Sequence, residues 1–358
     1  MEDIRHEIEG NPSAPALAKG SFRRFFFSMK GLIALSGFDL FILILMTITL
    51  SLLVRSLGST IRWLHPSMGL PVAILTSILL IELLKWLYFR IVKASTRARH
   101  FLYQIPEILR DWTPFILVVF IYENLHDLSG NLTNYNIAEY LHHFDVALFG
   151  VEPTLWMQKI AHPWLTDLMA IFYAPYLAYP LILMGIFSLA GRRHDFQNVS
   201  MALILTFVIG FICYAAFPCN PPRFHLEGAF TDPVKLSGSF IYFHLQGVLD
   251  EHTAVRGAAM PSLHTAISSV ALYFAFRYRN YSKLLKTIFY VYVPLIIGLW
   301  VATVYLRHHW IPDILAGWAV ALLSIVISKK LLAIQNKWRS DLGVETFSEK
   351  PAWIQSKH

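Results

Sequence analysis

The sequence predicts an all-α integral membrane protein with about eight transmembrane helices. Three observations support this prediction. Of its 358 residues, 56% are hydrophobic and 15% are charged, and the mean hydropathy is +0.50, whereas soluble domains average about 25% charged residues. Eight apolar segments reach the roughly 17–25 residues that a spanning helix needs. Lysine and arginine are abundant in every second loop, as they are in proteins that cross a membrane repeatedly.

The first three spans differ in how apolar they are. Residues 38–56 form an almost uninterrupted apolar run. Residues 70–92 contain Glu82 and Lys85, whose spacing of three allows them to pair on one helix face. Residues 112–128 are the least apolar, because polar side chains stand near their end, at Glu123, Asn124, His126 and Asp127.

The other five spans follow a segment, 136–160, that is too polar to cross a membrane. The apolar residues of this segment favour helices that lie in the outer membrane interface. The five spans are placed at 165–190, 198–218, 262–279, 285–306 and 311–332. Ser262 suits the N-cap of its span, and Pro312 suits the first helical turn, where no backbone donor is lost.

The distribution of basic residues predicts the orientation. The N-terminus, the alternate loops and the C-terminus hold 22 of the 30 lysines and arginines, and the opposite loops hold seven. By the positive-inside rule both termini are cytoplasmic. The predicted units are a cytoplasmic N-terminal segment, two spans with a basic loop, a membrane catalytic domain and a cytoplasmic tail, at 1–37, 38–109, 110–332 and 333–358.

Two short polar motifs stand at the mouths of predicted spans, both on the extracytoplasmic side. Residues 257–264 read Gly-Ala-Ala-Met-Pro-Ser-Leu-His, and residues 308–313 read His-His-Trp-Ile-Pro-Asp. Ionisable groups at a membrane boundary are costly and usually mark a functional site. We therefore expect one outward-facing active site that both motifs share.

The residue types in these motifs suit phosphoryl transfer. His309 and Asp313 are four residues apart, on one face of a helix that starts near Trp310. A carboxylate that accepts a hydrogen bond from one imidazole nitrogen fixes the tautomer and leaves the other nitrogen nucleophilic. Attack on phosphorus would give a phosphohistidine, and His264 would protonate the leaving oxygen. This chemistry needs no metal and no other cofactor.

Further residues on the same side are candidates for binding the phosphate. Ser262 offers a hydroxyl, Gly257 allows the backbone to approach closely, and the free N–H groups of a helix N-terminus attract an anion. A cationic ligand is also expected. The candidates are Arg223, Arg256 and Arg307. Anchoring at the lipid interface is the alternative explanation for each of them.

The two motifs together resemble the type 2 phosphatidic acid phosphatase superfamily, and within it the inositol phosphorylceramide synthase-like branch. Residues 257–264 are similar to that branch's form of the Pro-Ser-x-His motif. His309-x-x-x-Asp313, followed by Gly317, is similar to the end of the third superfamily motif. The resemblance implies that His309 is the nucleophile, Asp313 its orienting group and His264 the general acid and then base, without a metal.

The likeness covers roughly residues 110–330 and includes Pro221-Pro222-Arg223 and Asp145 with Leu148-Phe149-Gly150. It also has two departures. Ala302-Thr303 stand where the third motif has Ser-Arg, and the first motif, a lysine with an Arg-Pro pair, has no clear copy. The phosphate clamp must then come from elsewhere, first of all from Arg223. This loss separates lipid head-group transferases from the simpler phosphatases and favours transfer.

The preferred function is transfer of a phosphorylated head group, such as inositol phosphate from phosphatidylinositol, to a lipid alcohol such as ceramide or diacylglycerol. The alternatives are a phosphatase acting on lipid phosphates or polyprenyl diphosphates, and a transporter or scaffold that does not use the motifs. The partners are membrane lipids, and the basic loops carry no nucleic-acid signal. The membrane is either a bacterial inner membrane or a Golgi-type membrane, and the oligomeric state stays open.

Other polar groups receive the less specific interpretation. His308 is expected on another helix face than His309, with no direct role. His142, His143 and Asp145 fit a solvated face of an interfacial helix better than substrate recognition. A metal site at His308, His309 and Asp313 is disfavoured, because the same residues complete a metal-free mechanism. The two cysteines, Cys213 and Cys219, are expected to be unpaired.

Overall fold

The computed structural model describes residues 29–56, 98–129, 135–231, 236, 238–242 and 257–344, with isolated positions between 61 and 87. Within these residues every regular element is a helix, and the pairing of Cys219 with Ala258 is an isolated β-bridge. The all-α prediction is therefore confirmed for the described part of the chain.

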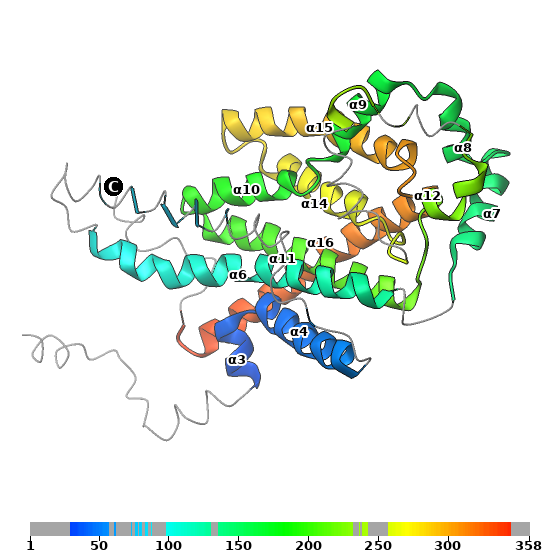
Figure 1. Cartoon of the computed structure of the whole chain (residues 1–358). Coiled ribbons are helices and arrows are strands. Elements are labelled where there is room, and N and C mark those ends of the chain that lie inside the picture. The colour runs from blue at the N-terminus through cyan, green and yellow to red at the C-terminus, as the bar shows by residue number, and fades with distance from the viewer. Residues whose placement is uncertain are drawn as a thin grey trace, which may run out of the picture.

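One group of helices runs side by side in a bundle, and a second group of elements gathers at one of its ends (Figure 1). The bundle helices are α4 (Phe38–Ser56), α6 (Ala98–Ser129), α9 (Pro163–Tyr173), α10 (Ala178–Leu189), α11 (Arg193–Ala216), α14 (Leu263–Tyr278), α15 (Lys283–Tyr305) and α16 (Ile311–Asp341). The second group is α7 (Ala138–Phe149), α8 (Pro153–Met157), η2 (Gln158–Ile160), α12 (Pro222–His225) and η3 (Glu227–Ala229), and α3 (Met29–Ser36) lies against α4 and α16 elsewhere.

Helix α14 lies in the middle of the bundle, in contact with α10, α11, α15 and α16. Its buried positions are small or apolar, as at Ala266, Ala271 and Ala275, so neighbouring helices approach closely. With 16 residues it is about 24 Å long, shorter than the roughly 30 Å hydrocarbon core of a bilayer. His264 lies in the first turn of this helix.

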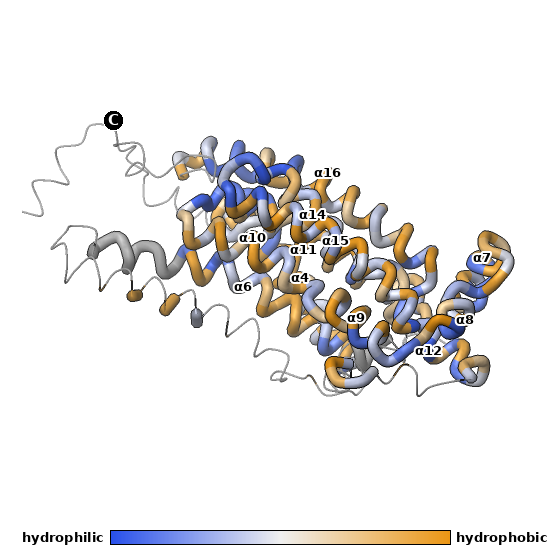
Figure 2. Tube along the Cα trace, turned by 90° about the horizontal axis from the view of Figure 1, so that it is seen from above, coloured by the Kyte–Doolittle hydropathy of each residue, from blue (hydrophilic) through white to orange (hydrophobic). Residues whose placement is uncertain are grey.

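Hydrophilic residues are concentrated at the two ends of the bundle (Figure 2). Among the described residues, five helical segments are long and apolar enough to cross a membrane. They are Phe38–Ser56, Pro163–Leu189, Arg193–Ala216, Lys283–Tyr305 and Ile311–Asp341. The chain is therefore a polytopic integral membrane protein, and the total of eight spans stays a prediction.

Most predicted spans correspond to helices with shifted ends. Residues 38–56 match α4, and α6 begins 14 residues before the predicted span 112–128. Helix α16 continues nine residues into the predicted tail, to Asp341. The predicted span 165–190 is interrupted: α9 ends at Tyr173 and α10 begins at Ala178. The predicted span 70–92 lies largely outside the described residues.

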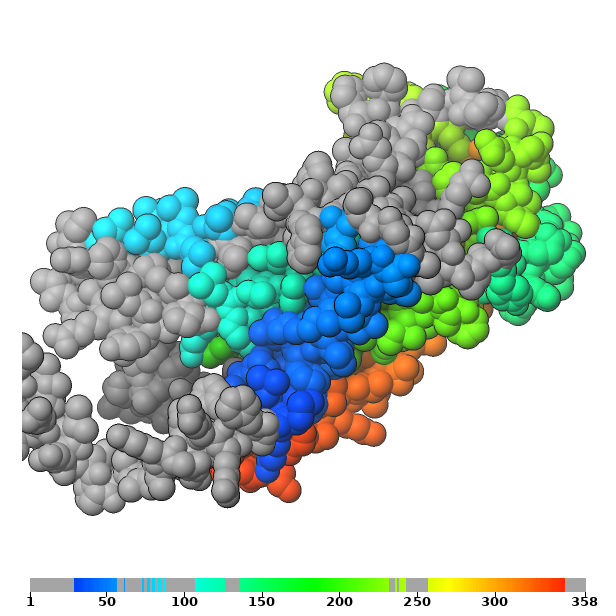
Figure 3. Space-filling view, turned by 60° about the horizontal axis from the view of Figure 1, so that its bottom comes forward, coloured from blue at the N-terminus to red at the C-terminus, as the bar shows by residue number. Residues whose placement is uncertain are grey.

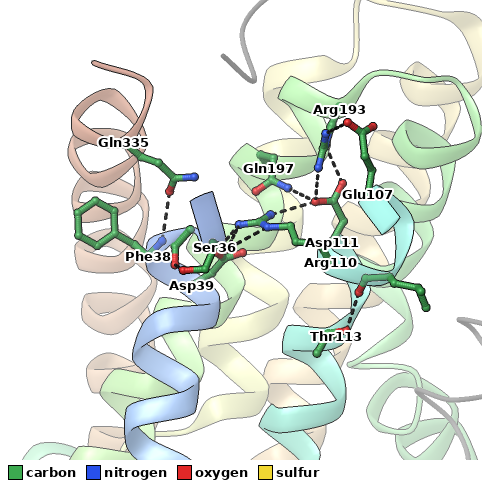
Figure 4. Close-up of polar contacts among 12 residues, drawn as sticks. Ser36, Phe38, Asp39, Glu107, Arg110, Asp111, Thr113, Arg193, Gln197 and Gln335 are labelled. Atoms are coloured by element: carbon green, nitrogen blue, oxygen red, sulfur yellow. Dashed lines mark hydrogen bonds and ion pairs between the residues drawn. The ribbon is translucent and has the colours of Figure 1, made fainter. Parts of the chain in front are cut away.

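At the end of the bundle opposite α7 and α12, a network of polar side chains joins three helices, α4, α6 and α11 (Figure 4). Arg110 contacts the carboxylates of Asp39, at 2.7 Å, and Asp111, at 2.9 Å. Arg193 contacts Asp111 at 3.0 Å, and Gln197 donates to the same carboxylate at 2.7 Å. In the space-filling view α4 lies beside α6 and near the end of α16 (Figure 3). We call Asp39, Arg110, Asp111, Arg193 and Gln197 the network.

Candidate active site

At the end of the bundle away from the network, the loop that carries the first polar motif is joined to the loop that follows α11. The backbone N–H of Cys219 donates to Gly257 O at 3.0 Å, and that of Ala259 donates to Cys219 O at 3.0 Å. Asn220 accepts from the Gly257 N–H through its Oδ1, also at 3.0 Å. Gly257 has φ +84°, a conformation that glycine adopts without strain. These bonds fix the chain where it enters α14.

The first turn of α14 is locked against the first turn of α16. The Ser262 N–H donates to the backbone oxygen of Asp313 at 2.9 Å. The Ser262 hydroxyl caps α14, since its Oγ accepts from the Thr265 N–H at 3.3 Å. Gly317 permits this contact, because a Cβ there would stand 2.7 Å from Ser262 O. The two motifs therefore have one fixed relative position.

The connection between α15 and α16 turns sharply to present two histidines. Arg307 has φ +65°, and the N–H groups of His308 and His309 both donate to Thr303 O, at 2.9 and 3.2 Å. A left-handed conformation at a residue other than glycine is costly and is often found at functional sites. Trp310 follows this turn, and its indole N–H donates a hydrogen bond to the backbone oxygen of Asn220 at 3.0 Å.

The three predicted catalytic residues form one hydrogen-bonded chain. His264 Nδ1 lies 3.2 Å from His309 Nε2, and His309 Nδ1 lies 3.3 Å from Asp313 Oδ2. The same Oδ2 accepts from the Trp310 N–H at 2.9 Å. Asp313 is fully buried and His309 is 4% exposed. When His309 Nδ1 carries its proton toward this carboxylate, Nε2 keeps a lone pair directed at the side where His264 lies.

Two tyrosines enclose the histidines, and sequence reasoning missed both. The Tyr173 ring stacks on His264, with centroids 4.5 Å apart, and on His308, at 4.8 Å. The Tyr176 ring centroid lies 4.2 Å from that of His264. Tyr173 is the last residue of α9, and Tyr176 lies in the interruption between α9 and α10. Pro175 in the middle of the predicted span was the available signal, because the residue before a proline disfavours helix.

The sequence comparisons assign the family. A profile of the PAP2 superfamily matches residues 139–327, more than half of the chain and all three of His264, His309 and Asp313. The chain belongs to the PAP2 superfamily. It is also 27% identical over 200 residues to phosphoinositol dihydroceramide synthase from Bacteroides thetaiotaomicron, a stretch that covers 53% of this chain and 64% of that protein. No solved structure matches.

In this PAP2 chain two of the three candidate arginines, Arg223 and Arg307, are described, and both lie at the end of the bundle that carries the histidines. The Arg223 N–H donates to Arg307 O at 3.0 Å, which ties α12 to the turn before His308. The Arg307 side chain is buried, with its guanidinium carbon 3.7 Å from the centroid of the Phe230 ring. Arg256 lies outside the described residues. No group of three or more potential metal ligands occurs among the described residues.

Helix α7 contributes a buried carboxylate, so the expectation of a solvated face is wrong for Asp145. Asp145 is 1% exposed, and its Oδ2 accepts from the Ile311 N–H at 3.2 Å, at the start of α16. The expectation holds for His143, which is exposed and pairs with Glu139. The local sequence of α7 does not show that Asp145 is buried. Its burial depends on contact with Ile311 at the start of α16, which is 166 residues away in the sequence.

Proposed function

We propose that this protein is a membrane phosphotransferase that moves a phosphorylated lipid head group to a lipid alcohol through a phosphohistidine. The observation that supports it most is the hydrogen-bonded chain from Asp313 through His309 to His264. Membership of the PAP2 superfamily supports lipid phosphoryl transfer or phosphatase chemistry. The relative named phosphoinositol dihydroceramide synthase supports inositol phosphate as the head group and ceramide as the acceptor class.

In the first half-reaction, His309 Nε2 forms a bond to the donor's phosphorus as the bond from phosphorus to the diacylglycerol oxygen breaks. His264 gives its proton to that oxygen, and diacylglycerol leaves. The phosphoryl group takes the place of the direct bond between the two histidines, whose nitrogens are 3.2 Å apart in the unliganded protein. Asp313 stabilises the cationic imidazole that forms.

In the second half-reaction, the hydroxyl of the acceptor gives its proton to His264, and its oxygen attacks phosphorus. The bond from phosphorus to His309 breaks, and the phosphorylated head group is now on the new lipid. The N–H groups at the start of α14 and the Arg223 guanidinium are proposed to stabilise the charge on the phosphoryl oxygens. Ser262, whose Oγ already caps α14, contributes mainly to the position of those N–H groups.

The test uses phosphatidylinositol labelled at phosphorus, with purified protein, with and without ceramide or diacylglycerol. Label in a new lipid only when an acceptor is present supports a transferase, and His309→Ala should abolish it. The matched control is His143→Ala, an exposed histidine on α7, which should keep full activity. Activity should persist in a metal chelator. Full activity of His309→Ala would refute the mechanism.

A lipid phosphatase is the second candidate. The match to the PAP2 superfamily supports a phosphatase as much as it supports a transferase. In that case water replaces the acceptor in the second half-reaction, with the same three residues. Release of labelled phosphate or inositol phosphate to water, regardless of acceptor, would identify it. If phosphatidylinositol is not turned over at all, phosphatidic acid and polyprenyl diphosphates are the donors to test.

We further propose that the site faces the extracytoplasmic side. Basic residues such as Arg192, Arg277 and Lys286 occur at the opposite helix ends from His264 and His309, as the positive-inside rule requires. In intact cells, a membrane-impermeant maleimide should label His143→Cys and leave Lys286→Cys unlabelled. The reverse pattern would place the site in the cytoplasm.

A further inference from the structure

His308 is a buried histidine that the mechanism above does not use. It is 3% exposed, and neither of its ring nitrogens has a hydrogen-bond partner among the described residues. Its place is fixed by other means: the ring stacks on Tyr173 at 4.8 Å with an interplanar angle of 18°, and its backbone N–H donates to Thr303 O. The imidazole is thus held firmly while its two polar atoms are left open.

Leaving buried polar atoms unsatisfied costs free energy of folding, and native proteins rarely tolerate it without a reason. Here the cost adds to the left-handed conformation of Arg307, which the turn before His308 requires. A phenylalanine at position 308 would keep the stack on Tyr173 and avoid the unsatisfied nitrogens. A ligand that bonds to the imidazole explains why a histidine stands there instead.

The surroundings of His308 indicate the kind of ligand. Burial lowers the pKa of His308 well below its ordinary value, and the neighbouring Arg223, His264 and His309 lower it further. The ring is therefore neutral, with one N–H donor and one acceptor. These neighbours are Arg223, the proposed phosphate clamp, and His264 and His309, the two histidines that the proposed mechanism places on either side of phosphorus. Tyr173 stacks on His264 as well as on His308, so a single aromatic ring connects His308 to the proposed general acid.

We propose that His308 donates a ring N–H to a non-bridging oxygen of the phosphoryl group that is being transferred. This assignment rests on the proposed function, since the ligand is the phosphoryl group of the same reaction. It replaces the expectation that His308 has no direct role. A fixed neutral donor at that oxygen strengthens its bond as negative charge develops in the transition state, at no cost of reorganisation.

The test compares His308→Phe with His308→Asn in binding of orthovanadate, whose oxygens can adopt the arrangement of a phosphoryl transition state, and in lipid turnover. Loss of one such donor typically costs about 10²–10³-fold in rate. We expect His308→Phe to lower kcat about 100-fold and to weaken vanadate inhibition by a similar factor. His308→Asn, which retains an N–H, should recover at least about tenfold of both. The control His143→Phe should change neither.

Stability separates this role from a purely structural one. His308→Phe should unfold at the same temperature as the wild type or higher, since it removes two unsatisfied nitrogens and keeps an aromatic ring against Tyr173. A structural role predicts instead that activity and unfolding temperature fall together and that His308→Asn restores neither. If His308→Phe is not produced as folded protein, His308→Asn against His308→Leu gives the same comparison.

The outcomes also distinguish this inference from the proposed function. If His308→Phe binds vanadate within threefold of the wild type, or if the wild type binds no vanadate, the inference is overturned. If vanadate binding depends on His308 but no label moves from phosphatidylinositol to an acceptor, the head-group transfer proposal fails and the phosphoryl subsite remains.

Discussion

The bundle has polar clusters at both ends, and they differ in how their titratable side chains are engaged: each charged side chain of the network is in an ion pair, whereas two histidines of the site have ring nitrogens without a partner in the described part of the chain. In the network, the carboxylate of Asp39 faces Arg110 at 2.7 Å, and that of Asp111 faces Arg193 at 3.0 Å. At the site, His264 has no hydrogen-bond partner at Nε2, and His308 has none at either ring nitrogen, among the described residues. Both clusters contain a fully buried carboxylate, Asp39 in the network and Asp313 at the site, so burial alone does not distinguish them.

The difference indicates two uses of buried polarity. A buried ion pair with good geometry holds helices in register, and removal of one partner leaves an uncompensated charge. A buried polar atom without a partner lowers stability but is available to a ligand. Substitutions in the network should therefore change unfolding with little effect on kcat, and substitutions at the site should do the opposite.

Asp313→Asn should have the largest effect. Asparagine can still accept from the Trp310 N–H, but it no longer provides a carboxylate to orient and stabilise His309. In the serine protease triad the equivalent change lowers kcat about 10⁴-fold, and we expect a loss of about 10³–10⁴-fold here, with the unfolding temperature nearly unchanged. Labelled-lipid turnover and thermal unfolding in detergent measure the two effects. A loss below tenfold would mean that Asp313 acts only as a helix cap.

Arg110→Met is the corresponding change in the network. Arg110 bonds to Asp39, whose side chain is fully buried, and to the backbone oxygen of Ser36. Breaking a buried pair costs about 3–5 kcal/mol, so we expect about 3 kcal/mol less unfolding free energy, with kcat of the folded protein within twofold. The control is Lys30→Met, which removes an exposed pair with Asp341 and should cost no more than about 1 kcal/mol. A large fall in kcat would show that the two ends are coupled.

Gly317→Ala tests the contact that sets the site's geometry. The added methyl group would lie 2.7 Å from Ser262 O, so the start of α14 must move away from α16. A shift of about 1 Å in a catalytic group costs about 10²-fold in rate, and we expect kcat to fall about 10- to 100-fold. Gly185→Ala is the matched control, because a Cβ there meets nothing within 4 Å. Unchanged kcat in Gly317→Ala would show that the helices adjust without disturbing His264.

The sequence was sufficient for the all-α class, for the bounds of several helices and for the residues of the hydrogen-bonded chain, and the reasons are physical. Apolar length determines a spanning helix, so α4 and α15 were placed closely, and the spacing of four in His309 and Asp313 needs only helix geometry. The charge asymmetry between loops was enough to bring His264 to the same end as His309.

What the sequence could not specify depends on contacts between distant segments. Asp39 and Arg110 are 71 residues apart, and Asp111 and Arg193 are 82 apart, so no local pattern pairs them. The stack of Tyr173 on two histidines needs the interruption between α9 and α10 and the position of α15 together. The same holds for Asp145, whose burial comes from α16.

Asp145→Asn should have the smallest effect and separates pairing from protonation. Burial, opposed by the Ile311 N–H, raises the pKa of the Asp145 carboxyl to about 7. Between its ordinary value near 4 and this value the folded protein holds more protons than the unfolded chain, so the unfolding free energy falls as pH rises from about 4 to about 7 and then levels off. Asparagine keeps an acceptor for Ile311 but does not titrate, so the unfolding temperature should fall less between pH 5 and pH 8 than in the wild type.

Asp145→Ala also removes the titration but loses the acceptor, and should be less stable than Asp145→Asn at both pH values. If Asp145→Asn keeps the full pH dependence of the wild type, another group is titrating, and Asp145 is not the source of the pH dependence.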